Sequence, residues 1–504
     1  MLPAVRLLRG PVRPNIRPST VFYLAVALLA TAPAWIVEHP PLQDYPFHFA
    51  TLRLIHSIHD PTYGFSEVYR LALLRTEYLL YYVVGDVLAF LVGVHAASVG
   101  MICLYLAGMP LGMRAFLRAL GRDERLSLFV VPLSVNVMFC MGLLPFVFGF
   151  PIMLFALAVA ARHFQKPRRK TGIVLALLTV ATFYAHILPF AIFGLGCIVL
   201  FPWTRPHRWI PCAAPLTAGV ALLGWWVLGS KAGGNAVGDI RGHEPFVHDF
   251  LRWTVAIFRD ESNENWFYAL GFVAVAALGM SMGERDRGDS AARGWFIVPV
   301  ACVLCYFTLQ GKLGEVWLYG QRFPLLALLT MVPLLRMPSG ARGLAVGAAA
   351  LLVCVGSVVN VCKHFIAYER QEVGDLDDAM AAMEPRAHVA GLIFDRMSTT
   401  MSDTYVPFLH YVSYYQAEKG GVVQFAYTGF PHWPVQYQDG QYPPATYPRL
   451  RLRWEWTPDQ VPIQELFPYY DYVLVRGFGF NPPAGTYHVK YHGARWTVFA
   501  RDGR

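Results

Sequence analysis

Charged residues are scarce in this chain. Only 15% of its 504 residues are charged, whereas 55% are apolar, and the mean hydropathy is +0.39. A soluble enzyme carries charge on about a quarter of its residues, so the composition excludes an ordinary cytosolic enzyme, a coiled coil and a disordered chain. The apolar runs that recur between Thr20 and Cys362 have the length that helices need to cross a bilayer. The sequence therefore predicts a polytopic membrane protein.

Cysteine is absent from residues 363–504, and all eight cysteines lie in or at the end of apolar segments. Neither a disulfide framework nor a zinc-type spacing among polar loops is predicted. Cys302 and Cys305 have the Cys-x-x-Cys spacing, but they lie inside an apolar run, and we interpret them as small packing residues. We expect no metal site and no cofactor.

Long apolar runs are missing after Cys362, and this divides the chain into two parts. Residues 1–362 are predicted to form a multi-span transmembrane domain. Residues 363–504, called the tail below, are long enough for a small domain of their own. The tail carries 13 basic and 15 acidic residues, and the membrane part carries 29 basic and 18 acidic ones. Basic loops on the cytoplasmic side explain this excess, so nucleic-acid binding is not predicted.

Basic residues gather in alternate loops of the membrane part. Four arginines precede the first apolar run, residues 20–37, which we interpret as an uncleaved signal anchor. Further basic clusters mark the short loops that follow. By the positive-inside rule, three longer loops, residues 38–77, 230–265 and 311–322, lie outside together with the tail. Function is expected on that side.

The number of crossings has one ambiguity. The runs near 78–94 and 96–113 would both cross, although Glu77 should lie outside and Arg114 inside. Either one of these runs does not fully span, or the 172–201 stretch is a single long helix and the neighbouring basic loops face outward. Both solutions leave the tail outside. We therefore predict 11–13 transmembrane helices.

The first outside loop opens with a carboxylate next to histidines. Pro46 suits a helix start, and Asp44 just before it can cap the free N–H groups of that helix. Residues 47–58 are predicted to form a helix along the membrane surface, with Asp44 and His48 about one turn apart on one face. Asp44 is then either only an N-cap or a carboxylate suited to proton abstraction.

This loop, the many helices and a C-terminal extracytoplasmic domain together resemble the GT-C glycosyltransferases. The stretch Asp-Tyr-Pro-Phe-His from Asp44 to His48 is similar to bacterial members near the protein-mannosyltransferase and aminoarabinose-transferase branch. The resemblance implies a helical GT-C-like membrane fold with a small C-terminal α/β domain. It also implies a polyprenyl-phosphate-linked sugar as donor and Asp44 as the base that activates the acceptor. His48 would orient Asp44.

The sequence also departs from known patterns of this superfamily. The Asp-Glu pair of protein mannosyltransferases is absent, because Gln43 precedes Asp44. The Trp-Trp-Asp motif of oligosaccharyltransferases is absent too, since Val227 follows the two tryptophans. Oligosaccharyl transfer is therefore not expected, and a catalytically degenerate relative stays open.

A polyprenyl-phosphate donor places an anionic phosphate at the outer membrane surface. Such a group calls for lysine or arginine, and arginine can bind two oxygens at once. Lys312 and Arg322 lie in the short loop 311–322, among aromatic residues typical of a membrane interface. The GT-C enzymes resemble this in using a basic residue late in the bundle for the donor phosphate. The alternative is that Arg322 binds no ligand and that its side chain only extends its charged end from the membrane interface into water.

Four more residues are candidates for the same cavity: Glu38, His39, His186 and Asp86. Asp86 is an acidic residue inside an apolar run, which is typical of a functional or paired group, and we favour a hydrogen-bonded structural role. His186 should reach the outside end of its helical hairpin. The loop 230–265 is rich in acidic residues and histidines, but no ligand spacing repeats, so a solvated surface is expected there.

The tail has the pattern of a small α/β domain. Its predicted strands are residues 388–394, 471–475 and 488–499, with a turn at 492–493, and its predicted helices are residues 375–383 and 406–418. Gly420 and Gly421 suit the end of the second helix. Aromatic residues and prolines crowd the stretch 424–456, which could bind sugar rings, pack on a sheet or lie at a membrane.

Together these features predict an inverting hexosyl- or pentosyltransferase in a bacterial-type cell membrane. Its partners would be membrane lipid, a polyprenyl-phosphate-linked sugar and an extracytoplasmic acceptor that the sequence does not identify. A transporter or flippase of lipid-linked substrates is one alternative. It would need charges on several helices and an internal repeat, whereas we find one clear intramembrane acid, Asp86, and no repeat. A non-catalytic membrane scaffold is the other.

Overall fold

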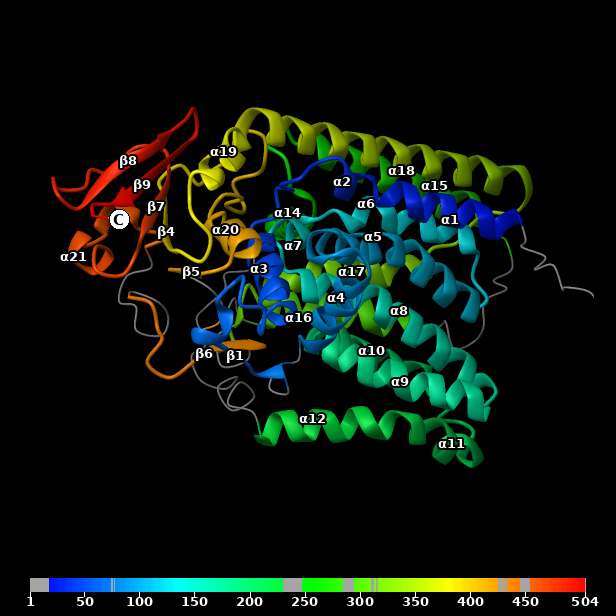
Figure 1. Ribbon diagram of the computed structural model, residues 1–504. Helices are drawn as coiled ribbons and strands as arrows, with labels where there is room; N and C mark the ends of the chain where they lie inside the picture. The colour runs from blue at the N-terminus through cyan, green and yellow to red at the C-terminus, as the bar shows by residue number, and fades with distance from the viewer. Residues whose placement is uncertain are drawn as a thin grey trace, which may run out of the picture.

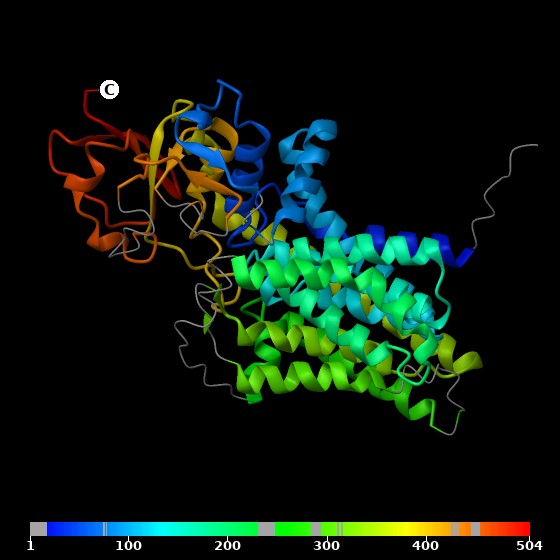
Figure 2. The same cartoon turned by 90° about the horizontal axis from the view of Figure 1, so that it is seen from below.

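A bundle of helices carries a mixed sheet at one of its ends (Figure 1). The perpendicular view in Figure 2 shows the sheet at the same end of the bundle. This computed structural model describes residues 18–73, 76, 78–229, 247–282, 284, 294–309, 312–313, 316–424, 428, 433–444 and 454–503.

Helices make up most of the described chain before the tail. They are α1 (Pro18–Ala30), α2 (Ala32–Trp35), α3 (Tyr45–His56), α4 (Leu79–Val92), α5 (Val94–Ala119), α6 (Val131–Ser134), α7 (Val137–Cys140), α8 (Leu144–Gln165), α9 (Arg169–Ala185), α10 (Ile187–Leu200), α11 (Trp209–Ala213), α12 (Thr217–Gly229), α14 (Val247–Val255), α15 (Ser262–Met280), α16 (Ile297–Thr308), α17 (Phe323–Met331) and α18 (Gly340–Tyr368). Two short strands, β2 (Lys312–Leu313) and β3 (Val316–Trp317), pair as an antiparallel hairpin before α17.

Several of these helices are apolar enough to cross a bilayer. Within the described ranges, four reach the necessary length: α5, α8, the segment Pro206–Leu228 that contains α12, and Gly340–Val373, which contains α18. Four shorter apolar helices correspond to α1, α4, α10 and α16. The predicted class, a helical membrane bundle followed by a small α/β part, is confirmed. The predicted count of 11–13 crossings stays a prediction.

One alternative for the crossings is excluded by the path of the chain. His186 adopts an extended backbone, with φ −176° and ψ 142°, between α9 and α10. The alternative of one long helix over residues 172–201 is therefore wrong. Gly85 of α4 faces Met101, so α4 folds back along the first half of α5. That one of these two runs does not fully span stays a prediction.

We call the two ends of the bundle the site end and the opposite end. At the site end, α18 finishes where the hydroxyls of Tyr368 and Tyr411 are 2.8 Å apart. At the opposite end, Gln165 donates to the carbonyl of Ala119 (3.1 Å), and Gly343, near the start of α18, lies against Arg125. The tail therefore begins at the site end.

The tail contains a five-stranded sheet with strand order β5-β4-β7-β9-β8. Its elements are α19 (Leu376–Ala381), β4 (His388–Ile393), α20 (Val412–Lys419), β5 (Val422–Val423), β6 (Val435–Tyr437), α21 (Ile463–Leu466), β7 (Tyr472–Arg476), β8 (Tyr487–His492) and β9 (Trp496–Arg501). Strand β4 is parallel to β5 and β7, whereas β9 is antiparallel to β7 and β8. The three predicted strand segments are thus found, and the second predicted helix starts later, at Val412. Gly420 ends that helix with φ +78°, as expected of a C-cap glycine.

The first outside loop and the tail are built together. Strand β1 (Tyr69–Leu71) of the loop pairs with β6 of the tail in antiparallel register, with Tyr69 opposite Tyr437. Helix α20 packs along α3, and one continuous hydrophobic core contains buried residues of the bundle, the loop and the tail. A smaller apolar cluster that includes Trp454 and Tyr470 lies within the tail alone.

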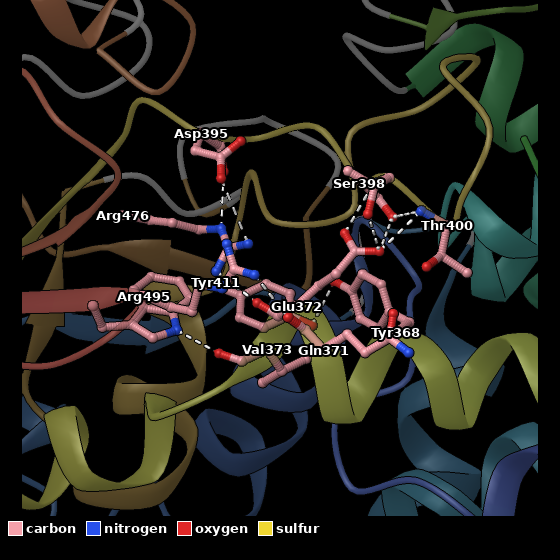
Figure 3. Close-up of polar contacts among 12 residues, drawn as sticks. Tyr368, Gln371, Glu372, Val373, Asp395, Ser398, Thr400, Tyr411, Arg476 and Arg495 are labelled. Carbon is pink, nitrogen blue, oxygen red and sulfur yellow. Dashed lines mark hydrogen bonds and ion pairs between the residues drawn. The ribbon is translucent and has the colours of Figure 1, made fainter.

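A buried arginine ties the tail to the end of α18 (Figure 3). Arg476 donates to the carbonyls of Asp395 (2.9 Å) and Glu372 (2.8 Å), and its guanidinium lies 3.5 Å from the centre of the Phe408 ring. The Glu372 carboxylate, in a π-helical turn after α18, accepts hydrogen bonds from Ser398, Thr399 and Thr400. We call Arg476, Glu372, Asp395 and Phe408 the Arg476 latch.

Candidate functional site

Helix α3 carries the predicted carboxylate at its first turn. Asp44 occupies the N-cap position, with Pro46 in the first turn, but its side chain makes no capping hydrogen bond. The interpretation of Asp44 as only an N-cap is therefore wrong. The side chain is 7% exposed, so the structure holds it in the interior rather than at an open surface.

Two polar side chains approach the carboxylate of Asp44. The amide nitrogen of Gln43 donates to Oδ1 (3.2 Å), and Nε2 of His410 lies 3.3 Å from the same oxygen. His410 comes from the tail, and its ring packs on Phe47 with the ring centres 4.0 Å apart. The site therefore combines the first outside loop with a residue more than 360 positions later in the sequence.

His48 lies close to Asp44 but uses its ring elsewhere. Its Nδ1 is 2.8 Å from the hydroxyl of Tyr82, and the ring also hydrogen-bonds to the carbonyl of Gly142. That His48 orients Asp44 stays a prediction, and Gln43 and His410 contact the carboxylate of Asp44 directly. Burial lowers the pKa of His48 to about 4, against the smaller opposing effect of the Asp44 charge. His48 is neutral at physiological pH.

Trp433 of the tail covers this part of the site. Its indole nitrogen donates to the hydroxyl of Thr51 (3.1 Å), and its ring lies 5.7 Å from His48 and 6.2 Å from Tyr78, centre to centre. Trp433 is 5% exposed. It belongs to the aromatic-rich stretch 424–456, much of which lies outside the described residues, and here it packs against α3.

A second polar pair lies at the site end. Nη1 of Arg322, at the start of α17, is 3.1 Å from Nε2 of His186, which joins α9 to α10. Both side chains are buried, and the guanidinium lies over the ring of Phe146 at 5.2 Å. The structure thus brings together two residues that the sequence proposed separately.

Nη1 of Arg322 and Nε2 of His186 are both hydrogen-bond donors. Nδ1 of His186 accepts from the backbone N–H of Leu188 (3.0 Å), so a neutral ring carries its proton on Nε2. Nη1 of Arg322 lies 3.1 Å from this same nitrogen. An anionic oxygen there would accept from both, which is the arrangement expected of a phosphate site.

One short segment connects the carboxylate to the arginine pair. Gly142 has φ +76°, and a Cβ atom there would overlap the backbone of Asp44. Phe146, four residues on, lies under Arg322 and beside the ring of His186. Four residues of chain reach at most about 14 Å, so both polar groups flank the start of α8.

Three predicted cavity residues lie elsewhere. Asp86 is paired with His56, Oδ1 to Nδ1 2.8 Å, between α4 and α3, which agrees with the structural role favoured for it. Glu38 is exposed. His39 is buried against the tail, where its ring contacts Glu369 (3.2 Å) and Asp377 (3.5 Å).

The residues around His39 determine the pKa of its ring. Burial lowers its pKa, but the hydrogen bond and charge of Glu369, with Asp377, outweigh burial and raise the pKa above its ordinary value. His39 therefore joins the loop to the tail rather than Asp44. Lys312 lies in β2, and its side chain is outside the described part of the structure.

The loop 230–265 is described only from residue 247. Asp239, Arg241 and the other polar residues before that point lie outside the described residues. Asp260 contacts His364 of α18 at 3.0 Å, which is a surface pair between helices. No group of three histidine, cysteine or acidic side chains suited to a metal is found where the structure is described.

Sequence reasoning missed His410 and Trp433 as parts of the site. Trp433 stood in the aromatic-rich stretch, where a packing role was one of three alternatives. His410 gave no signal, because nothing in the pattern Phe408-Leu409-His410 distinguishes it from a packed histidine in a helix. Only the docking of α20 on α3 brings it to Asp44.

Comparisons with known proteins agree with this architecture. No family model and no curated protein matches the sequence. Among solved structures, ArnT from Cupriavidus metallidurans bound to undecaprenyl phosphate is similar, with a TM-score of 0.53 and 13% identity over 96% of this chain and 98% of that chain. The apo state of ArnT gives a TM-score of 0.54 and 12% identity over 96% and 97%. At this identity the likeness concerns the fold alone, and the chain has a fold similar to that of ArnT.

Proposed function

We propose that this protein is a membrane glycosyltransferase that moves a sugar from a polyprenyl phosphate to an acceptor on the side of the tail. The observation that carries the proposal is the site end itself, where a buried carboxylate, Asp44, and a pair of phosphate-type donors, Arg322 and His186, flank the start of α8. The similar ArnT structure contains undecaprenyl phosphate, which supports a donor of this class.

The chemistry assigns each group one task. The carboxylate of Asp44 takes a proton from the acceptor while the acceptor oxygen attacks the anomeric carbon of the sugar. The bond between that carbon and the phosphate oxygen breaks, and the polyprenyl phosphate leaves with the bonding electrons. Because negative charge develops on the phosphate, the donors of Arg322 and His186 stabilise the transition state more than the bound donor. His48 stays neutral and shapes the space beside Asp44.

The tail is proposed to be extracytoplasmic, together with the site end. The basic-residue asymmetry supports this orientation, because the opposite end carries the arginine cluster around Arg114 to Arg125. A cysteine placed at an exposed tail position, such as Phe478 (95% exposed), should react with a membrane-impermeant thiol reagent in intact cells. Reaction only after lysis would place the site on the other side of the membrane.

The phosphate assignment is tested by binding. Undecaprenyl phosphate should raise the Tm of the purified protein, and Arg322→Gln should remove that shift while the protein remains folded. Arg114, also buried but paired with Glu124 at the opposite end (2.9 Å), is the matched control, so Arg114→Gln should keep the shift. If Arg322→Gln binds undecaprenyl phosphate like the wild type, Arg322 is only an interfacial anchor.

Turnover separates the proposal from its alternatives. In proteoliposomes loaded with undecaprenyl-phosphate hexose or pentose and an envelope extract that supplies acceptor, the enzyme should release undecaprenyl phosphate. A flippase would move the intact lipid-linked sugar across the bilayer without releasing phosphate. A scaffold would do neither.

A further inference from the structure

His410 of the tail is in direct contact with Asp44, the proposed base. Nε2 of His410 lies 3.3 Å from Oδ1 of Asp44, and both residues are buried, with 4% and 5% of their surfaces exposed. Because Nε2 faces a carboxylate, the ring proton belongs on that nitrogen. Phe47 covers the ring of His410 at 4.0 Å and restricts its rotation. His410 is therefore a fixed donor to Asp44.

A second tether leads from the tail to the same oxygen. The side-chain carbonyl of Gln43 accepts from the backbone N–H of Val406 (2.9 Å), and its amide nitrogen donates to Oδ1 of Asp44 (3.2 Å). Gln43 is thus held by the tail while it holds Asp44. Residues 406–410 therefore supply or orient two donors to one carboxylate oxygen.

We infer that the tail completes the catalytic centre, with His410 as the positioning residue that orients the carboxylate of Asp44. This rests on the proposed function, because it assigns His410 a role only if Asp44 is the base. Helix packing alone would not require two donors on one buried oxygen. A buried carboxylate is costly to ionise without such donors, and donors to the charged form lower its proton affinity.

Two variants and a control test the inference in the undecaprenyl-phosphate release assay. His410→Phe keeps a flat ring against Phe47 but removes the donor, and His410→Gln keeps a donor. His488→Gln is the matched control, since His488 also pairs with a carboxylate, Asp502 at 2.7 Å, on the exposed strand β8. Each variant is measured for kcat and for KM for the lipid-linked sugar.

We expect His410→Phe to lower kcat about 10- to 100-fold with little change in KM, the range of a lost hydrogen bond to a charged group. His410→Gln, which keeps a donor, should recover part of the loss. Wild-type kcat in both variants would overturn the inference. If His410→Phe does not fold, the kcat and KM of His410→Gln decide: a wild-type kcat there overturns the inference. A wild type that releases no undecaprenyl phosphate overturns the proposed function instead.

Discussion

Two buried arginines at the same end of the molecule have opposite surroundings. Arg476, 2% exposed, donates to the carbonyls of Asp395 and Glu372, and its face is covered by Phe408. Arg322, 6% exposed, faces the ring nitrogen of His186, which is itself a donor. Backbone carbonyls accept hydrogen bonds from the first guanidinium, whereas the second lies beside a histidine ring whose other nitrogen already accepts a hydrogen bond.

The difference indicates what each arginine is for. A buried cation whose donors meet backbone carbonyls is part of the fold, and losing it leaves those carbonyls without their donor. Two donors that converge on one space suit an anion that arrives from outside. Substitutions in the Arg476 latch should therefore reduce stability, and substitutions at the site should reduce function at nearly unchanged stability.

The largest expected effect is on turnover at Asp44. Asp44→Asn is nearly isosteric but cannot accept the proton, so kcat should fall about 10²- to 10⁴-fold, the usual contribution of a general base. The Tm should change little, because Asp44 makes no capping hydrogen bond whose loss would destabilise α3. Release of undecaprenyl phosphate and thermal unfolding are measured on the same preparation. Normal turnover in this variant would remove Asp44 from the mechanism.

The next effect is on stability at the latch. Arg476→Met keeps part of the packing on Phe408 but removes both hydrogen bonds, which should lower the free energy of unfolding by about 3 kcal/mol or more. Thermal unfolding and limited proteolysis of the tail measure this loss. The folded fraction should still bind undecaprenyl phosphate. A variant that keeps its Tm but loses that binding would reverse the comparison between the two arginines.

His48 sharpens the comparison, because it lies at the site but should behave like a structural residue. Its pKa is about 4 in the folded protein and 6.5 in its ordinary state, so the unfolded chain binds more protons between these values. The neutral His48 ring therefore contributes fully to the free energy of unfolding above pH 6.5. As the pH falls toward 4, the free energy of unfolding decreases by about 3 kcal/mol in total.

The measurement for His48 is the Tm as a function of pH. His48→Gln should flatten the decline between pH 6.5 and 4 relative to the wild type. The exposed His488, substituted by Gln, should leave the decline unchanged. Identical curves for the wild type and His48→Gln would mean that His48 is not held neutral by burial.

The smallest expected effect concerns the shape of the cation at residue 322. Arg322→Lys keeps the charge but loses the planar fork, so the affinity for undecaprenyl phosphate should fall about tenfold. Titration of the purified protein with undecaprenyl phosphate measures the change. Equal affinities for lysine and arginine would mean that charge alone attracts the phosphate, and that His186 does not share it with Arg322.

The sequence alone predicted the features of the site that depend on neighbouring residues, but not the contacts between residues far apart in the chain. Asp44 and the start of its helix could be read from the spacing to Pro46, because helix starts depend on neighbouring residues. The same pattern also suggested an N-cap bond, which the side chain of Asp44 does not make. An orienting role for His48 stays a prediction, and the pattern gave no sign of His410, which lies beside Asp44.

Composition and periodicity by themselves determined the membrane class and the strands of the tail, because apolar length and side-chain alternation are properties of local sequence. The division predicted at Cys362 stays a prediction, and Cys362 lies within α18. The sequence also gave Arg322 and His186 as separate candidates. Their convergence at 3.1 Å, and that of Asp44 with His410 at 3.3 Å, were decided only by the tertiary structure. The bundle brings the ends of α9 and α17 together, and β1 with β6 fixes the tail against the first loop. Contacts between residues hundreds of positions apart depend on packing of whole elements, which no local pattern encodes.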